Sequence, residues 1–229
     1  MAKTVNETVL PKNIQLWKQS MDTLPGHVFN FTRKAMMNQL PTLHNLKLWN
    51  CSSTNLCPKC GSDQTNKHVL SNCSSSDALA RYTDRHNLIL ELIAKWIVPK
   101  LKINQSLYCD LRVPGARPVC DLFKKVRPDL AIVSPNKIVV GELTVCHETN
   151  LLKSRDYKLQ KYCNLKAAVS REFSRCAVLT HTFEVSTLGF VVAEPNFFKN
   201  SGLPNFDPLL VKELTRTAIL ASKSIYCNR

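Results

Sequence analysis

Four residues between positions 57 and 73 have the types and the spacing of a zinc site. Cys57 and Cys60 form a C-x2-C pair, and His68 and Cys73 complete the pattern C-x2-C-x7-H-x4-C. Zinc takes four thiolate or imidazole ligands in a tetrahedron, and Gly61 directly after the pair permits the backbone to fold back. Because four protein ligands leave no open position, the pattern predicts a structural zinc site rather than a catalytic one.

The segment around these residues, 51–76, is rich in Cys, Ser, Asn and Gly and too poor in apolar residues to build a core alone. A bound metal would hold it, so free thiols and a surface histidine are the weaker interpretation. Cys51 is the nearest spare thiol and could replace one ligand. The ten cysteines are spread over a mid-sized chain, and with a tight C-x2-C this favours metal binding in a reducing compartment.

Asp129 and Glu142 are a second set of residues that could do chemistry. They fall in consecutive strand-like runs joined by Ser134-Pro-Asn-Lys137, a tetrapeptide that suits a type I turn. If Pro135 and Asn136 are the central residues of this turn, counting back in register places Asp129 opposite Glu142. Facing residues have Cβ atoms about 4.5 to 5.5 Å apart, and two like charges at that separation destabilise a sheet.

A bound divalent cation would turn this pair into a site. Mg²⁺ binds one or two carboxylates together with water and phosphate oxygens, and Mn²⁺ suits the same ligands. Such an ion can activate water and stabilise the leaving oxygen in phosphodiester hydrolysis. The alternative is that Asp129 is a capping residue at the edge of the turn and that Glu142 is a solvent-exposed strand residue. Either carboxylate alone favours that alternative, whereas the pair in register favours the metal site.

A basic helix is predicted directly after the second carboxylate strand. In the run from Lys153 to Tyr162, Arg155, Lys158 and Tyr162 fall on one helical face, and Lys161 lies one turn from Lys158. A lysine beside two metal-binding carboxylates could neutralise the charge that develops on the phosphate or orient the attacking water. Alone, the run is equally well explained as a solvated face, but its position after the hairpin favours the functional interpretation.

The charge of the chain points to a polyanionic partner. It carries 31 Lys and Arg against 17 Asp and Glu, a formal net charge of +14. Such an excess favours nucleic acid or an acidic membrane face. Basic residues flank the carboxylate pair on both sides, and we expect them to hold the DNA backbone through salt-sensitive contacts: Lys124, Lys125, Arg127, Lys153 and Arg155.

The elements that must position these residues follow from hydrophobic periodicity and from helix breakers. Helical patterns cover much of 1–50, interrupted at Pro25-Gly26. The other predicted elements are helices at 77–101, 150–173 and 209–226 and strands at 129–133, 138–145, 177–185 and 188–192. This order predicts a mixed α/β or α+β domain. We expect a helical connector at 1–50, a zinc knuckle at 51–76 and a main domain at 77–229.

Membrane insertion is not expected. No stretch has the roughly 18 to 20 apolar residues of a membrane-spanning helix, and the first residues lack the apolar run of a signal peptide. We therefore expect a protein that acts inside the cell.

Together these motifs resemble the C-terminal part of site-specific non-LTR retrotransposon proteins, in which a CCHC zinc knuckle precedes a restriction-like endonuclease of the PD-(D/E)xK superfamily. The resemblance covers roughly residues 50–190. Its motifs are the four knuckle ligands, Arg81-Tyr-Thr-Asp-Arg-His86, Arg127-Pro-Asp129 with Glu142, and Lys158-Leu-Gln-Lys161-Tyr162.

The resemblance implies a restriction-endonuclease-like α/β core at 77–229 with a small zinc knuckle before it and flanking helices. It implies a Mg²⁺- or Mn²⁺-dependent endonuclease that nicks DNA in the nucleus. A reverse transcriptase portion of the parent element, for which the sequence contains no polymerase palm, would then prime on the exposed 3′ end. The implied roles are metal ligands for Asp129 and Glu142, catalytic lysine for Lys158 or Lys161, and a supporting role for Tyr162.

One position departs from the wider superfamily. The lysine expected two residues after the second carboxylate is here Thr144, which shares the Glu142 face of the strand but carries no charge. A lysine from the following helix would have to replace it.

Two other functions are compatible with the same residues. The first is a catalytically inactive module, from a decayed or domesticated element, that binds DNA or RNA. The second is a zinc-knuckle adaptor that recruits a polymerase or another protein through residues 1–50. Among single residues, His86 and Glu91 are lower-ranked candidates for the metal site, and His147-Glu148 fits helix capping better than acid/base chemistry.

Overall fold

A six-stranded mixed sheet lies at the centre of the computed structural model, which describes residues 9–123, 126–169, 173–193 and 195–229. The strands are β1 (Ser106–Cys109), β2 (Ala116–Pro118), β3 (Leu130–Ser134), β4 (Lys137–Cys146), β5 (Ala177–Ser186) and β6 (Val191–Ala193). Their order is β2-β1-β3-β4-β5-β6. The pairs β1/β3, β3/β4 and β5/β6 are antiparallel, whereas β1/β2 and β4/β5 are parallel.

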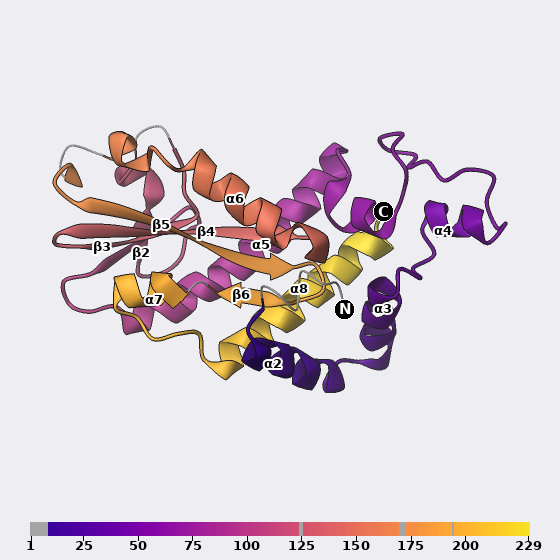
Figure 1. Ribbon diagram of the computed structural model, residues 1–229, viewed down its shortest axis with the longest axis horizontal. Helices are drawn as coiled ribbons and strands as arrows, with labels where there is room; N and C mark the ends of the chain where they lie inside the picture. The colour runs from indigo at the N-terminus through magenta and orange to yellow at the C-terminus, as the bar shows by residue number, and fades with distance from the viewer. Residues whose placement is uncertain (1–8, 124–125, 170–172, 194) are drawn as a thin grey trace.

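Helices cover both faces of this sheet (Figure 1). On one face, α5 (Ser76–Ile97), α7 (Pro195–Ser201) and α8 (Pro208–Cys227) pack over alternate strand residues such as Leu130 and Val139. On the other face, the segment from α6 (Leu151–Lys161) to the 3-10 turn η5 (Leu165–Ala168), with η3 (Val119–Asp121), covers residues such as Ala131 and Val140. Because strand side chains alternate, the sheet has an apolar cluster on each face. The predicted mixed α/β class is confirmed, and the arrangement is consistent with a restriction-endonuclease-like core.

Helix α5 follows the sequence prediction for 77–101 closely. The Ser75 side chain accepts a hydrogen bond from the Ala78 N–H, which caps the first turn. The helix ends at Ile97, and Pro99 lies in the 3-10 turn η2 (Val98–Lys100) that follows. Its inward stripe is buried in the core: Ile89, Leu90, Ile93, Ala94 and Ile97.

The helix predicted at 150–173 is shorter than expected. Helix α6 ends at Lys161, and the chain turns through Tyr162 into η5. Tyr162 and Leu165 are both 4% exposed in the cluster that contains Val140. The exposed helix therefore ends where the chain must bring these two side chains down onto the sheet, a requirement of tertiary packing rather than of helix propensity.

Three short elements were absent from the prediction. β1 has four residues and β2 three, and α7 has seven, of which Phe197 and Phe198 are buried. Elements this short carry too few residues for a periodic pattern to separate them from loops. β1 nevertheless pairs with β3 and forms the neighbour of the carboxylate hairpin.

The N-terminal segment, predicted as a helical connector, packs against the main body over its described residues. It contains α2 (Pro11–Asp22), α3 (Gly26–Met36) and α4 (Leu43–Leu48), with the predicted break at Pro25-Gly26. Trp17 of α2 stacks on Phe190 with ring centroids 4.5 Å apart, and its Nε1 donates to the Leu188 carbonyl at 2.7 Å.

Arg85 joins the knuckle to both long helices from a buried position. Its side chain is 1% exposed, and Nη1 donates to the Leu70 carbonyl and to Ser222 Oγ, both at 2.9 Å. Leu70 belongs to the π-helical turn η1 (His68–Asn72), and Ser222 belongs to α8. Burial lowers the pKa of Arg85 to about 10, so the guanidinium is charged at neutral pH. The buried guanidinium of Arg85 thus holds the knuckle against α5 and α8.

Within the part of the chain that the structure describes, no helix combines the length and the apolar character needed to cross a membrane.

Candidate active site and metal centre

The hairpin of β3 and β4 brings Asp129 and Glu142 together in the predicted register. Leu130 pairs with Gly141, so Asp129, one residue earlier, faces Glu142. The Asp129 N–H donates to Glu142 Oε1 at 3.0 Å, and the Leu143 N–H donates to Asp129 Oδ2 at 2.7 Å. Backbone donors from both strands therefore hold the two carboxylates at one end of the hairpin.

Lys158 reaches this pair from α6. Its Nζ donates to Glu142 Oε2 at 2.8 Å and lies 3.8 Å from Asp129 Oδ2. Glu142 is fully buried, and the Asp129 side chain is 12% exposed. Thr144 lines the same hollow as Lys158. The helix lysine therefore lies beside the carboxylates where the strand itself supplies only an uncharged threonine.

His86 completes the set from the opposite direction. Its Nε2 lies 3.4 Å from Asp129 Oδ1, and its side chain is 24% exposed. The sequence prediction gave this residue a low rank. Its place could have been inferred from spacing, because positions 86, 89, 93 and 97 share one helical face and the last three are the buried isoleucines of α5.

Burial and mutual repulsion set the charges of the pair. Burial and the neighbouring Asp129 charge raise the pKa of Glu142 to about 7. Burial also acts to raise the pKa of Asp129, but the His86 hydrogen bond and the charges of His86 and Lys158 outweigh it and hold that pKa below its ordinary value. Burial opposes the charge of Lys158, yet the two carboxylates raise its pKa. At neutral pH the site therefore contains a charged Asp129 and a charged Lys158, and Glu142 keeps its proton to a higher pH than an exposed glutamate does.

Lys161 and Tyr162 lie beside this centre in different ways. Lys161 is exposed, with Nζ 4.8 Å from the centroid of the Tyr162 ring. Tyr162 is buried, and its hydroxyl donates a long hydrogen bond to the Arg127 carbonyl at 3.5 Å. Burial and the Glu142 and Asp129 charges raise the pKa of Tyr162, which keeps the phenol neutral. Of the two candidate lysines, Lys158 is the one in contact with the carboxylates.

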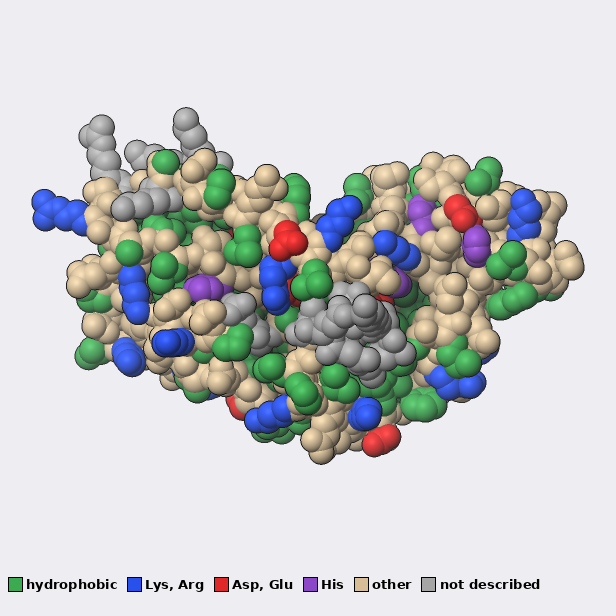
Figure 2. Space-filling model, in the orientation of Figure 1, with side chains coloured by type: hydrophobic (Ala, Val, Ile, Leu, Met, Phe, Trp, Pro, Cys, Tyr) green, Lys and Arg blue, Asp and Glu red, His purple; other side chains and the backbone are tan. Residues whose placement is uncertain are grey.

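Two of the residues predicted to hold DNA are exposed near the carboxylates. Lys153 is exposed on α6, and Arg127 is exposed two residues before Asp129. Arg127 Nε donates to Asp110 Oδ1 at 2.8 Å. Figure 2 shows Lys and Arg side chains spread over this view of the molecule, with Asp and Glu side chains sparse.

The other predicted DNA contacts are placed differently. Arg155 Nη2 donates to Glu184 Oε2 at 2.9 Å, and Glu184 is buried in β5. Arg155 therefore fixes α6 to the sheet. Lys124 and Lys125 lie outside the described residues. Glu91 pairs with Lys95 at 2.6 Å on the solvent side of α5 and is not part of the carboxylate centre.

Two hollows are lined by residues close to the carboxylates, one including Lys158 and the other including Arg127. One, of about 350 Å³, runs along α6 and is lined by Thr144, Asn150, Lys153 and Lys158 among others. The second, of about 670 Å³, is formed by residues between 109 and 120 together with Arg127, and its lining includes Arg112. Each hollow therefore has basic side chains in its lining, Lys153 and Lys158 in the first and Arg112 and Arg127 in the second.

The predicted knuckle residues come together as a Cys3His group that could bind a metal such as zinc. Ligand atoms of Cys57, Cys60, His68 and Cys73 all lie within 4.8 Å of one another. The Cys60 and Cys73 sulfur atoms are 3.8 Å apart, and Cys60 Sγ is 3.4 Å from His68 Nε2. A tetrahedral zinc with bonds of about 2.3 Å to sulfur would place two thiolates about 3.8 Å apart. Cys51 is exposed and lies outside this group.

Local hydrogen bonds shape the knuckle around these ligands. Gly61 has a φ of +73°, and its N–H donates to the Cys57 carbonyl at 2.8 Å, so the turn closes as the sequence predicts. The Tyr82 hydroxyl of α5 accepts from the Cys73 N–H at 3.2 Å and donates to the Val69 carbonyl at 2.9 Å. Burial lowers the pKa of His68 and favours the neutral imidazole that a metal requires.

Of the pair His147-Glu148, only His147 has the predicted capping geometry, because the buried Glu148 carboxylate accepts from the Leu188 N–H instead. His147 is the N-cap of the 3-10 turn η4 (Glu148–Asn150), and its Nδ1 accepts from the Thr149 N–H at 3.4 Å.

No protein-family model and no curated protein matches this chain.

Proposed function

We propose that this chain is a metal-dependent DNA endonuclease that nicks its target by phosphodiester hydrolysis. The observation that supports it most is the contact of Asp129, Glu142 and Lys158 at the end of one hairpin, close to two hollows lined in part by basic residues. Burying two carboxylates side by side costs folding free energy, and such costs are concentrated at functional sites. The proposal includes a nuclear target and a reverse transcriptase portion that uses the nicked strand.

The donor set fits a hard divalent cation. Asp129 and Glu142 offer carboxylate oxygens, the ligands that Mg²⁺ and Mn²⁺ prefer, and their mutual repulsion would be relieved by a cation between them. Bound there, the ion would lower the pKa of a water ligand and stabilise the charge of the leaving oxygen.

The surrounding side chains would then have separate tasks. Lys158, which lies 2.8 Å from Glu142 Oε2, would donate to a phosphate oxygen and stabilise the charge that develops in the transition state. His86 would hold Asp129 in orientation through Oδ1. Tyr162 is neutral and buried beside the same centre. Its hydrogen bond to the Arg127 carbonyl would help to hold the chain just before Asp129 in place.

For the knuckle we propose a structural zinc ion. Its four ligands would fill the coordination sphere, so the ion would stabilise the segment without taking part in cleavage.

A nicking assay tests the endonuclease. The zinc-loaded chain is incubated with supercoiled plasmid and Mg²⁺, Mn²⁺ or no added divalent cation, and compared with Asp129→Asn and Glu142→Gln. We expect metal-dependent nicking that falls at least 100-fold in both variants. Glu91→Gln, which removes an exposed carboxylate of α5, is the matched control and should nick like the parent. Absence of nicking in a folded, DNA-binding parent, or equal nicking in the variants, would refute the proposal.

A second candidate is an inactive nucleic-acid-binding module. It is favoured by the Lys158–Glu142 ion pair, which neutralises a buried carboxylate without any metal. This candidate predicts salt-sensitive DNA binding that is the same in the parent and in Asp129→Asn, together with no metal-dependent nicking.

A further inference from the structure

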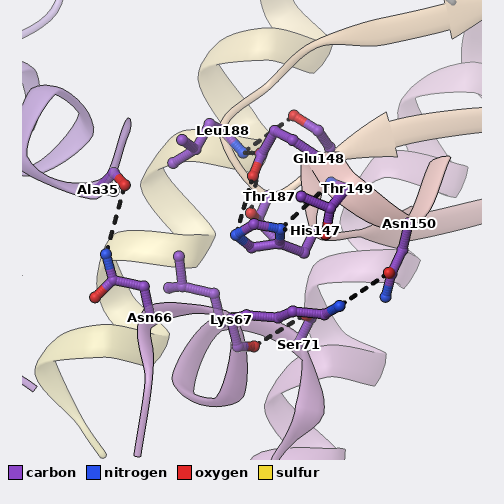
Figure 3. Close-up of polar contacts among 12 residues, drawn as sticks. Ala35, Asn66, Lys67, Ser71, His147, Glu148, Thr149, Asn150, Thr187 and Leu188 are labelled. Carbon is purple, nitrogen blue, oxygen red and sulfur yellow. Dashed lines mark hydrogen bonds and ion pairs between the residues drawn. The ribbon is translucent and has the colours of Figure 1, made fainter. Parts of the chain in front are cut away.

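A cavity of about 500 Å³ lies where three distant parts of the chain meet. Met36 at the end of α3 forms one wall, Lys67 just before the knuckle ligand His68 forms another, and His147 at the end of β4 forms a third. Figure 3 shows these parts converging, with the Lys67 side chain extended toward Asn150 and the His147 ring beside Glu148. The volume is in the range of pockets that hold small organic ligands.

The cavity has an apolar floor and a polar rim. Leu188 and Phe190 are 3% and 1% exposed and form its buried apolar part. Glu148 is also buried, and its Oε1 accepts from the Leu188 N–H at 2.9 Å and from Thr187 Oγ1 at 3.1 Å. That carboxylate is therefore used within the fold. A flat apolar group with an attached anion suits such a cavity better than a simple ion does.

Lys67 supplies positive charge at the rim and links the cavity to the carboxylate centre. Its Nζ donates to Asn150 Oδ1 at 3.0 Å. Asn150 also lines the hollow along α6, together with Lys153 and Lys158. From Asn150 to Lys158 the helix rises about 12 Å. At about 3.4 Å per nucleotide along one strand, this distance is about three or four nucleotides.

We propose that the cavity holds an unpaired base of a nucleic-acid strand whose backbone passes along α6, with phosphates on Lys67 and Lys153. This inference rests on the proposed function, because it takes the carboxylate centre as the place where the same strand is bound. A paired base lies inside the duplex and cannot enter a concave pocket, whereas an unpaired base can turn outward into one. The cavity thus selects a strand that is locally single-stranded a few nucleotides from the carboxylates.

Binding measurements on matched DNA probes test this without cleavage. Fluorescence anisotropy is recorded with the zinc-loaded chain and Ca²⁺ in place of Mg²⁺. The probes are a 20-base-pair duplex, the same duplex with a four-nucleotide flap on the 5′ or 3′ end, and the flapped duplexes with abasic flaps. Abasic flaps keep the phosphates and remove the bases. We expect one normal flap to bind at least about fivefold tighter than its abasic counterpart.

Two variants test whether the preference for normal over abasic flaps comes from the cavity. Met36→Trp fills the cavity from its exposed rim and should abolish the difference between normal and abasic flaps while leaving affinity for the blunt duplex unchanged. Lys67→Met should weaken flap binding severalfold. The slope of log affinity against log salt concentration should fall by about 1, as expected for the loss of one phosphate contact. Lys47→Met is the matched control, because Lys47 is also bonded to an asparagine side chain, Asn55 Oδ1 at 3.2 Å, but lies on α4.

The outcomes are distinct from those of the nicking assay. Equal affinity for normal and abasic flaps, or a preference that survives Met36→Trp, would overturn the proposal. Competition by free AMP at concentrations near those of the flapped probe would also overturn it, because the cavity would then serve a free nucleotide. If the protein prefers normal flaps over abasic flaps but does not nick plasmid, the base-binding proposal stands and only the endonuclease proposal is rejected.

Discussion

Lys158 Nζ lies 2.8 Å from Glu142 Oε2, although the lysine comes from a helix and the carboxylate from the strand before it. On that strand the position two residues after Glu142 is Thr144, which carries no charge. The helix lysine therefore places a positive charge beside the buried carboxylate pair, although the strand has no lysine at position 144. This relationship divides the roles of the two helix lysines, and the first prediction follows from it.

Lys158→Ala should reduce metal-dependent nicking by about 100-fold or more, because it removes the ammonium group that contacts the carboxylate pair. Lys161→Ala should change nicking no more than severalfold, since Lys161 is exposed above the Tyr162 ring. Rates of plasmid nicking at saturating Mg²⁺ compare the two. A larger loss in Lys161→Ala than in Lys158→Ala would reverse the assignment.

His86→Ala should raise the Mg²⁺ concentration needed for half-maximal nicking by about tenfold, because Asp129 loses the group that orients it. His86→Asn, which keeps a donor of similar reach, should recover part of this loss. The readout is the metal dependence of the rate rather than the maximal rate alone. His27→Ala, on the exposed side of α3, is the control. An unchanged metal requirement with a lower maximal rate would argue against a positioning role.

The stability of the zinc-loaded chain without Mg²⁺ should fall as pH rises from about 5 to 7.5. The folded pKa of Glu142 is about 7, above its ordinary value of 4.5. Between these values the unfolded chain loses the Glu142 proton and the folded chain keeps it, so rising pH favours unfolding by up to about 3 kcal/mol.

Urea denaturation of the zinc-loaded chain without added Mg²⁺ across this pH range measures the effect. Glu142→Gln cannot ionise and should remove most of the decline. The His86 pKa, which burial lowers but the Asp129 hydrogen bond and charge raise overall, accounts for a smaller remaining fall near neutral pH. The lowered pKa of Asp129 acts at lower pH and in the opposite direction, so the series is kept above pH 5. Mg²⁺ at pH 7.5 should restore stability to the parent but not to Glu142→Gln. A parent whose stability is flat or rising over this range would contradict the prediction.

Removing the proposed zinc should destabilise the chain by about 3 kcal/mol or more, because the segment at 51–76 has little apolar surface of its own. For a chain of this length that lowers Tm by about 6 to 12 °C. Cys57→Ser should show the same loss and bind less zinc, whereas Cys51→Ser, outside the Cys3His group, should behave like the parent. Metal analysis and thermal denaturation of the three proteins give both quantities. Equal zinc content in all three would exclude Cys57 as a ligand.

Features that depend on neighbouring residues were predictable from the sequence. The turn at Pro135-Asn136 fixes the hairpin register, and the register alone places Asp129 opposite Glu142. The knuckle ligands follow from spacing, because C-x2-C and a glycine act over a few residues. The long helix α5 and the last helix α8 were also found, since each repeats its apolar pattern over several turns.

Features that depend on distant contacts were not predictable in the same way. The end of α6 at Lys161 is set by the burial of Tyr162 against the far face of the sheet. The pairing of Arg155 with Glu184 requires β5 to lie beside α6. Spacing alone placed Arg155 on the same helical face as Lys158 and could not separate a group that contacts the sheet from one that contacts a ligand.

The buried guanidinium of Arg85 also sets an order of assembly during synthesis. The knuckle ligands are complete once Cys73 has been made, but Ser222, one of the two groups that Arg85 holds, follows 149 residues later. At about 5 to 20 residues per second the ribosome needs roughly 7 to 30 s to supply it. The proposed zinc ion can thus be taken up by a knuckle that has not yet docked. Metal delivery and closure of the fold around Arg85 become two separate events in the life of the nascent chain.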